Sequence, residues 1–199
     1  MKPQTRILAI SEHYDPIVGG TTTYVKHVCQ HLRTAGANIR LIHPGPQELG
    51  KIEFSESSFP RISIGLGTNI KTHYHRPLRY RFVELVNDFV MQEIAAGKVE
   101  IVHNLFGLFL TERLDVPAFQ AAGVKVFNTI HNVPPEECSL SWPGDRWLPA
   151  AKEKLRLQLV RAKNQQRLKK YAYDRYIVPS DMVRKSLQDV LPHQHPRLD

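Results

Sequence analysis

The sequence predicts an α/β fold in which a doubly wound, mostly parallel sheet carries helices on both faces. Short, mostly apolar runs, such as residues 7–10 and 39–43, are typical of strands buried on both sides. These runs alternate with longer stretches whose apolar residues recur every three or four positions, the period of an amphipathic helix. The length of 199 residues suits one domain. We therefore expect one Rossmann-like domain over residues 1–199.

The N-terminal part of the chain contains a complete strand–helix–strand unit. Residues 7–10 form the first strand, and residues 39–43 form the second. The helix between them starts at Thr21 and stops at Gly36, a residue that suits the position after a helix end. Its apolar stripe consists of Val25, Val28, Cys29, Leu32 and Ala35.

The same alternation continues along the rest of the chain. Residues 47–61 are mostly polar and are expected to form a loop. Further strands are expected at residues 62–64, 100–103, 125–131 and 175–178. Further helices are expected at residues 78–96, 111–122 (interrupted by Pro117), 147–173 and 180–190. Because helices connect successive strands, the strands should run parallel.

The composition favours an anionic partner and excludes several classes of protein. There are 27 basic and 19 acidic residues, a net charge of +8, and the mean hydropathy is −0.34. No apolar run approaches the length of a membrane span, and the apolar run near the N-terminus is too short for a signal peptide. We therefore expect a cytoplasmic protein. The two cysteines, Cys29 and Cys138, show no metal-binding spacing, so free thiols and no metal site are expected.

A basic stretch, residues 152–170, concentrates much of this charge. Between Lys152 and Lys170 there are eight basic residues and a single acidic one, Glu153. A solvated helix face and a surface for an anionic membrane both fit this pattern. Nucleic acid is disfavoured because no aromatic residues are interleaved with the charges.

Candidate functional residues follow the expected strands, where open parallel sheets bind their ligands. Gly19, Gly20 and Thr21 open the first helix, where free N–H groups can bind an anion, although a tight turn without a ligand is the alternative. Two strand ends carry histidines, His103 and the pair His131–Asn132; either histidine could instead be structural. Ser180 either lines the same edge or only caps the last helix. The glycine patterns of NAD sites and of P-loops are absent.

Four segments together resemble glycosyltransferase family 4. Residues 7–21 resemble the family's opening strand and its aromatic–x–Pro–x–x–Gly–Gly loop. Residues 100–103 look like its Asp-Ile-Val-His strand, and residues 126–132 are similar to its strand ending in His-Asp. Residues 173–180 match its Ala-Asp-Arg segment that leads to a serine. Asn132 replaces the usual aspartate.

The resemblance implies one half of a GT-B fold, the N-terminal domain that binds the acceptor. It implies transfer from a nucleotide sugar with retention of the anomeric configuration and without an essential metal or other cofactor. His131 would act beside the transferred sugar, and Gly19, Gly20, Thr21, His103, Asn132 and Ser180 would bind substrates. The donor-binding domain is absent from the 199 residues, so the isolated chain should be inactive unless a separate chain supplies that domain. The alternative is a stand-alone binding or scaffold protein on a degenerate glycosyltransferase domain.

The expected partners follow from the same resemblance. They are a nucleotide sugar, a sugar or lipid-linked acceptor, and the missing donor-binding domain. The basic stretch adds an anionic membrane surface, which would make the protein peripheral at the cytoplasmic face of the membrane. No nucleic acid is expected.

Overall fold

The computed structural model describes residues 4–14, 19–68, 76–131, 173–181 and 183–185. The chain divides into a first unit, residues 1–128, and a second unit, residues 129–199. Each unit is described by itself. The helix expected over residues 147–173, the basic stretch, Asn132 and Cys138 lie outside the described residues.

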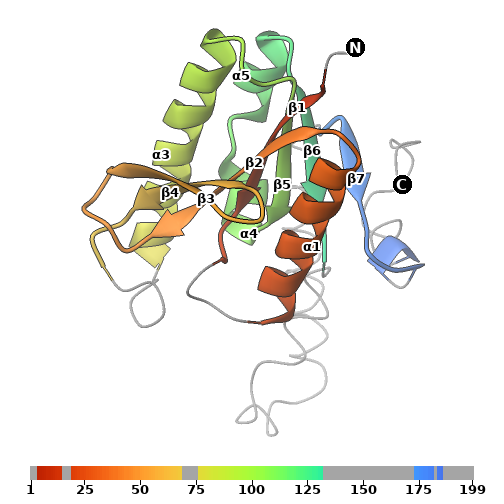
Figure 1. Ribbon diagram of the computed structural model, residues 1–199, viewed down its shortest axis with the longest axis horizontal. Helices are drawn as coiled ribbons and strands as arrows, with labels where there is room; N and C mark the ends of the chain where they lie inside the picture. Colours follow the sequence, from red (N-terminus) through yellow and green to blue (C-terminus); the bar gives the residue numbers. More distant parts are fainter. Residues whose placement is uncertain (1–3, 15–18, 69–75, 132–172, 182, 186–199) are drawn as a thin grey trace, which may run out of the picture. The chain divides into compact units, whose positions relative to one another are not determined.

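The sheet of the first unit confirms the predicted fold class (Figure 1). Its strands lie in the order β3-β4-β2-β1-β5-β6. β1 pairs in parallel with β2 and β5, β2 with β4, and β5 with β6, whereas β3 and β4 are antiparallel. The strand bounds are Arg6–Ser11, Asn38–Gly45, Ile52–Glu56, Pro60–Gly65, Ile101–Phe106 and Lys125–Thr129 for β1 to β6 in turn.

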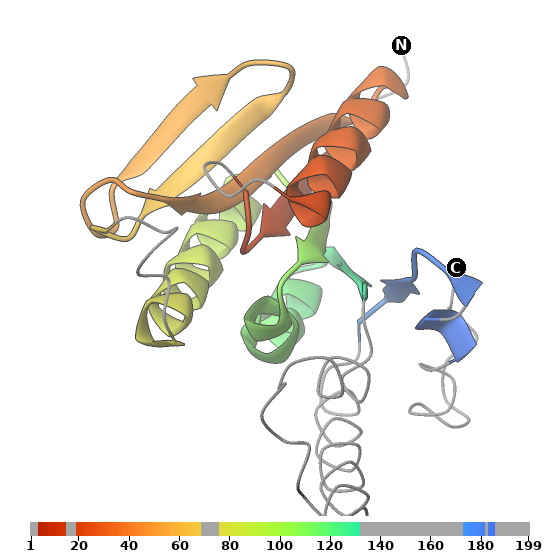
Figure 2. The same ribbon diagram turned by 90° about the horizontal axis from the view of Figure 1, so that it is seen from below.

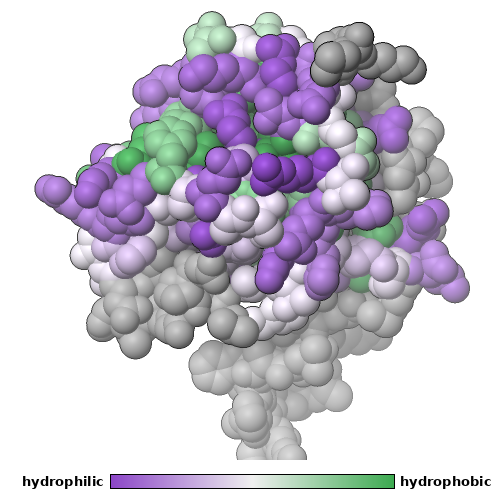
Figure 3. All heavy atoms as spheres, viewed as in Figure 1, coloured by the Kyte–Doolittle hydropathy of each residue, from purple (hydrophilic) through white to green (hydrophobic). Residues whose placement is uncertain are grey.

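Helices cover both faces of this sheet. α1 (Gly20–Thr34) lies on one face, and α3 (Arg76–Ala95) and α4 (Leu108–Arg113) lie on the other (Figure 2). Leu8, Ile10, Val102 and Val126 are fully buried, as expected for strands covered on both sides. On the face of the molecule that carries α1, hydrophilic residues predominate (Figure 3).

α1 forms where the apolar stripe predicts it. Val25 and Cys29 are completely buried and pack in one cluster with Ala9 and Leu41 of the sheet. Burial raises the pKa of the Cys29 thiol to about 12, so Cys29 is a core residue and not a nucleophile at neutral pH. Ala35, the last residue of the predicted stripe, is exposed because it lies beyond the last helical residue.

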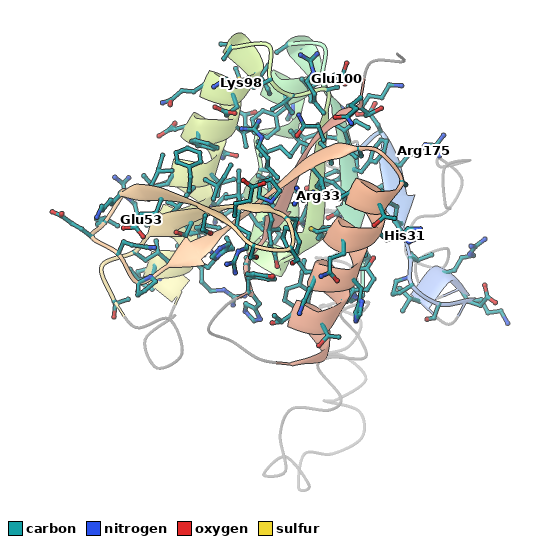
Figure 4. All side chains as sticks on the ribbon, viewed as in Figure 1. His31, Arg33, Glu53, Lys98, Glu100 and Arg175 are labelled. Atoms are coloured by element: carbon teal, nitrogen blue, oxygen red, sulfur yellow. The ribbon has the colours of Figure 1, made fainter. Side chains whose placement is uncertain are left out.

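The prediction of a loop over residues 47–61 was wrong, because this segment contains β3. Ile52 and Phe54 alternate with polar residues, and they pair with Ile64 and Ile62 of β4 in an antiparallel register. Arg33 at the end of α1, labelled in Figure 4, holds the hairpin, with bonds to the Glu56 carboxylate at 3.4 Å and to the Ser58 carbonyl at 3.0 Å.

The single helix predicted over residues 111–122 is two short helices. α4 ends at Arg113, and α5 (Val116–Ala121) begins after it. Pro117 lies in the first turn of α5, where its missing N–H is not needed. The Asp115 carboxylate caps the helix by accepting the Ala118 N–H at 3.2 Å.

The second unit contains the predicted strand near residue 175. β7 (Arg175–Ile177) lies between the buried Tyr173 and Val178. The Ile177 carbonyl accepts the Ile130 N–H at 2.9 Å. Residues 181 and 183–185 are helical, which agrees with the start of the predicted last helix.

Two phenylalanines of the β3–β4 segment test this description of the core. Phe59 is fully buried, whereas Phe54 is 70% exposed. Phe59→Ala should lower the free energy of unfolding by about 3–5 kcal/mol because it leaves a cavity in the core. Phe54→Ala, the matched control, should change it by no more than about 0.5 kcal/mol. Urea denaturation of both variants measures the difference, and similar losses would contradict the packing.

Candidate functional site

The residues that follow β1 are buried at the carboxyl edge of the sheet. The Glu12 N–H donates to the Phe106 carbonyl at 2.9 Å, which joins β1 and β5 beyond their last pair. Tyr14, the aromatic residue of the Gly-Gly motif, is 5% exposed and belongs to the core. Its ring lies 5.1 Å from that of His43, and the Arg61 guanidinium lies over it at 5.7 Å. The aromatic residue therefore anchors the start of the loop.

The carboxylate of Glu12 joins three elements. Its side chain is completely buried. One oxygen accepts the Leu110 N–H of α4 at 2.8 Å, and the other accepts from the Arg79 guanidinium of α3 at 2.5 Å. A Cβ added to Gly107, which has φ +141°, would lie 2.5 Å from Glu12 Cγ. A glycine is therefore required where the chain passes over Glu12.

His13 is half-buried beside this ion pair. Its ring lies 5.0 Å from that of Phe106. Its backbone is fixed by Ser11, whose hydroxyl donates to the His13 carbonyl at 2.7 Å. Burial, and next the positive charge of Arg79, lower the pKa of His13, so its imidazole is neutral at pH 7.

A polar network lies at the carboxyl ends of β5 and β6. The Asn104 amide donates to Asn128 Oδ1 at 2.7 Å and to Thr111 Oγ1 at 3.0 Å. Asn104 and Asn128 are fully buried, and their backbones pair in the sheet. Buried amides that bond each other fix the ends of the two strands and the start of α4.

Gly19, Gly20 and Thr21 lie at the start of α1, as predicted. The Gly19 backbone is extended (φ 175°), a conformation open to any residue. Among the described residues, no atom lies within 4 Å of a Cβ placed on Gly19 or Gly20. Neither backbone strain nor packing against described atoms explains the two glycines. Their predicted contact with a ligand stays a prediction.

His103 does not lie at a strand end, because β5 continues to Phe106. It occupies mid-strand, paired with Ala9 and Phe127, and it is 6% exposed. Burial lowers the pKa of His103 to about 4. Its expected place at the edge was therefore wrong, while its substrate-binding role stays a prediction.

The other predicted site residues belong to the second unit. His131 is half-buried, just after Ile130. The Ser180 hydroxyl accepts the Val183 N–H at 3.3 Å, so Ser180 caps the last helix. The predicted roles of His131 and Ser180 with substrate stay predictions, since the glycines and His103 belong to the first unit.

Glu12 and Arg79 are functional candidates that the sequence reasoning missed. The signal available for Glu12 was an acidic residue two positions after the apolar run of residues 7–10. Across the described ranges, no group of three or more His, Cys, Asp and Glu side chains could hold a metal ion. None of the helices in this part of the chain is long and apolar enough to cross a membrane.

Two glycines separate the effect of backbone strain from the effect of contact with Glu12. Gly107 and Gly123 both have positive φ, but no described atom lies within 4 Å of a Cβ on Gly123. Gly123→Ala should cost about 1–2 kcal/mol through strain alone. Gly107→Ala should cost about 1–3 kcal/mol more, because the Glu12 side chain must shift. Denaturant unfolding measures the free energy of unfolding of both variants. Equal losses would show that the contact between residue 107 and Glu12 does not affect stability.

The buried His103 should make stability depend on pH. Its pKa is about 4 in the folded chain and about 6.5 when unfolded, so the unfolded chain binds more protons between these values. This contribution is complete above pH 6.5 and is lost as the pH falls towards 4, by up to about 3 kcal/mol. His103→Phe should make the melting temperature depend less on pH over this range. His27→Gln, on the exposed side of α1, should leave the pH dependence of the melting temperature unchanged. An unchanged slope in His103→Phe would place the pH response elsewhere.

Comparison with solved structures finds proteins with a similar fold. A sucrose-phosphate synthase from Thermosynechococcus elongatus matches with a TM-score of 0.54 and 15% identity, over 97% of this chain and 86% of that chain. An α,α-trehalose 6-phosphate synthase from Burkholderia multivorans matches with a TM-score of 0.51 and 15% identity, over 96% and 43%. The UDP-forming α,α-trehalose-phosphate synthase from Burkholderia vietnamiensis gives a TM-score of 0.50 and 13% identity, over 95% and 43%.

The chain therefore spans less than half of the length of the two trehalose-phosphate synthases. At these identities the likeness shows the fold alone. No curated protein matches the chain. The family model of Glycosyltransferase Family 4 matches residues 18–198, which is nearly the whole chain. The chain belongs to glycosyltransferase family 4.

Proposed function

We propose that this chain is the acceptor-binding domain of a retaining glycosyltransferase. Joined to a donor-binding domain, it transfers a sugar from a nucleotide sugar to a glycan, a lipid-linked acceptor or a small molecule. The observation that carries the proposal is the family match over residues 18–198, on a first unit with a doubly wound sheet. The buried polar groups at the carboxyl edge support it, because ligands of such sheets bind there.

The proposed roles follow from what each group can do chemically. Gly19, Gly20 and Thr21 let the donor diphosphate approach the N-terminus of α1, a helix of 15 residues whose first N–H groups can bind an anion. The imidazole of His131 hydrogen-bonds the transferred sugar or orients the acceptor hydroxyl. His103, Asn132 and Ser180 complete the proposed substrate contacts.

The proposed cellular setting rests on composition. The net charge of +8 and the basic stretch, residues 152–170, support a peripheral protein at the cytoplasmic face of an anionic membrane. No metal is proposed for the reaction, since nucleotide-sugar transfer of this kind is expected to proceed without one.

The isolated chain should fold but should not transfer sugar. Alignment of donor and acceptor can supply ~7–11 kcal/mol of a barrier, and that alignment needs both domains. Calorimetry of the 199-residue chain with UDP-glucose, a probe suggested by the UDP-forming synthase, should show binding weaker than about 1 mM. Transfer should appear only after a donor-binding chain is added. Turnover by the purified single chain would overturn the half-enzyme proposal.

Gly20→Val tests the glycine pair in the completed enzyme. We expect kcat/KM to fall at least tenfold, a loss of about 1.4 kcal/mol, with melting almost unchanged, because no described atom meets a Cβ at Gly20. Gly36→Val at the other end of α1 is the control. Gly36 has φ +92°, so this variant should melt earlier and keep its kcat/KM. If Gly20→Val melts early and is otherwise active, the glycines have a structural role only.

A further inference from the structure

Exposed apolar side chains gather at one strand of the first unit. In the described part of the chain, four large apolar side chains are exposed: Leu49, Ile52, Phe54 and Met91. Three of the four belong to residues 49–54, within β3 or just before it, and Phe54 is 70% exposed. Single exposed apolar residues are ordinary, but a group of them at one place marks a surface that contacts another molecule.

β3 is the outer strand at this end of the sheet (Figure 2). Among the described residues, only β4 pairs with it. An outer strand presents unpaired backbone N–H and C=O groups, to which another strand can bond. Prolines and bulges commonly block such edges. β3 contains no proline, and its register with β4 is regular along its whole length.

The pairing with β4 shows which backbone groups of β3 face outward. Glu56 pairs with Pro60, which has no N–H, so this pair cannot be one of the hydrogen-bonded pairs of the ladder. Hydrogen-bonded and non-hydrogen-bonded pairs alternate, and the Lys51 carbonyl does accept a bond from beyond β4 at 2.8 Å. The N–H and C=O groups of residues 52, 54 and 56 therefore point away from β4, towards the open edge.

These outward groups fit a second copy of the same strand. In an antiparallel pair with a two-fold axis at Phe54, this residue faces Phe54 of the second copy, and Ile52 faces Glu56. Every outward N–H and C=O of β3 then has a partner. An axis at Glu53 would place two carboxylates directly opposite each other, which is destabilising. An axis at Glu53 or at Ser55 would also leave the outward groups of one residue in each copy without a partner on β3.

The charges beside this edge cancel within one copy. Lys51 Nζ lies 3.0 Å from a Glu53 carboxylate oxygen, and the Arg33 guanidinium lies 3.4 Å from that of Glu56. The whole chain has a net charge of +8, yet these four groups sum to zero, so two copies can approach here without local repulsion. In the favoured register, moreover, Glu53 faces the uncharged Ser55 of the second copy.

The apolar side chains of β3 lie on one face of the sheet. Leu41 packs in the cluster beneath α1, so its neighbour Ile42 faces the side that carries α3. Ile62 pairs with Ile42, and Phe54 pairs with Ile62, so Phe54 lies on the α3 side as well. The rings of the two copies therefore meet on the same side of the joined sheet, where a pair of aromatic side chains adds to the stability of the contact.

We propose that two copies of this chain associate through β3, as antiparallel strands related by a two-fold axis at Phe54. A strand of five residues with few apolar side chains buries less surface than a permanent dimer, so we expect a dissociation constant of about 10–100 μM. β4 and β2 separate β3 from β1, so the carboxyl end of β1 lies outside the contact. The inference does not depend on the proposed function.

Sedimentation of the full chain over a range of concentrations tests the association. The 22.8 kDa chain should change reversibly from monomer to dimer as its concentration rises. Phe54→Lys and Phe54→Glu should each weaken the dimer at least tenfold, because like charges then face each other across the axis. Both variants should melt like the monomeric wild type, since Phe54 is largely exposed. His27→Lys, which adds the same charge on the exposed side of α1, should dimerise normally.

Mixing the two variants tests the two-fold register. Lysine of one copy would face glutamate of the other, so an equimolar mixture of Phe54→Lys and Phe54→Glu should form mixed dimers at least as tight as the wild type. Recovery of the dimer in the mixture also shows that each variant is folded. If both variants are folded and the mixture stays monomeric, the inference is overturned.

The competing explanation is that the charged side chains of β3 protect its edge from other strands. It predicts a wild-type chain that stays monomeric at every concentration, which would overturn the inference. Dimers of Phe54→Lys as tight as those of the wild type would also overturn it, because the contact would then lie elsewhere. Growth into open-ended assemblies would do the same, since a two-fold contact closes at the dimer.

Discussion

The buried carboxylate of Glu12 is the interaction on which the carboxyl edge of the sheet depends. Removing a carboxylate from water costs several kcal/mol, and only good partners offset that cost. Here the partners come from separate elements, Arg79 of α3 and the Leu110 N–H of α4, and the Glu12 backbone bonds to the end of β5. Because breaking a buried pair costs about 3–5 kcal/mol, the end of β1 and the starts of α3 and α4 are fixed together.

The opposite edge of the sheet is stabilised in a different way. Arg6 pairs with Glu100 where both side chains are nearly half exposed, and Lys98 reaches Glu93 from a side chain that is 59% exposed. Such surface pairs contribute about 0–1 kcal/mol each. Only the pair of Arg40 with Glu93 is well shielded among the ion pairs described at that edge. The ion pair whose carboxylate is completely buried, Glu12–Arg79, thus lies at the edge where ligands of this fold bind.

Sequence patterns predicted those elements whose cause is local. The apolar residues of β1, β2 and β6 and the helical stripe of α1 are visible within a few neighbouring residues. β3 was missed because its alternation spans only five residues and its apolar side chains, Ile52 and Phe54, are exposed at the sheet edge. The sequence predicts an end of β5 at His103 because Asn104 is polar, although the Asn104 amide nitrogen donates to Asn128 and Thr111 inside the fold. The Glu12–Arg79 pair joins residues 67 positions apart, and no spacing rule for a single sequence predicts such a contact.

Two kinds of glycine show how structure and function can be separated in this chain. Gly107 has a positive φ and lies against Glu12, so the fold requires it whatever the protein binds. Gly19 and Gly20 meet neither condition among the described residues, yet they stand at the start of a 15-residue helix. A glycine that the fold does not require lowers stability, because glycine increases the conformational freedom of the unfolded chain. The proposed function accounts for that cost, because it predicts that the backbone at Gly19 and Gly20 approaches a ligand more closely than a side chain would allow. Gly107 is an example within the fold, because its backbone approaches Glu12 more closely than a side chain would allow.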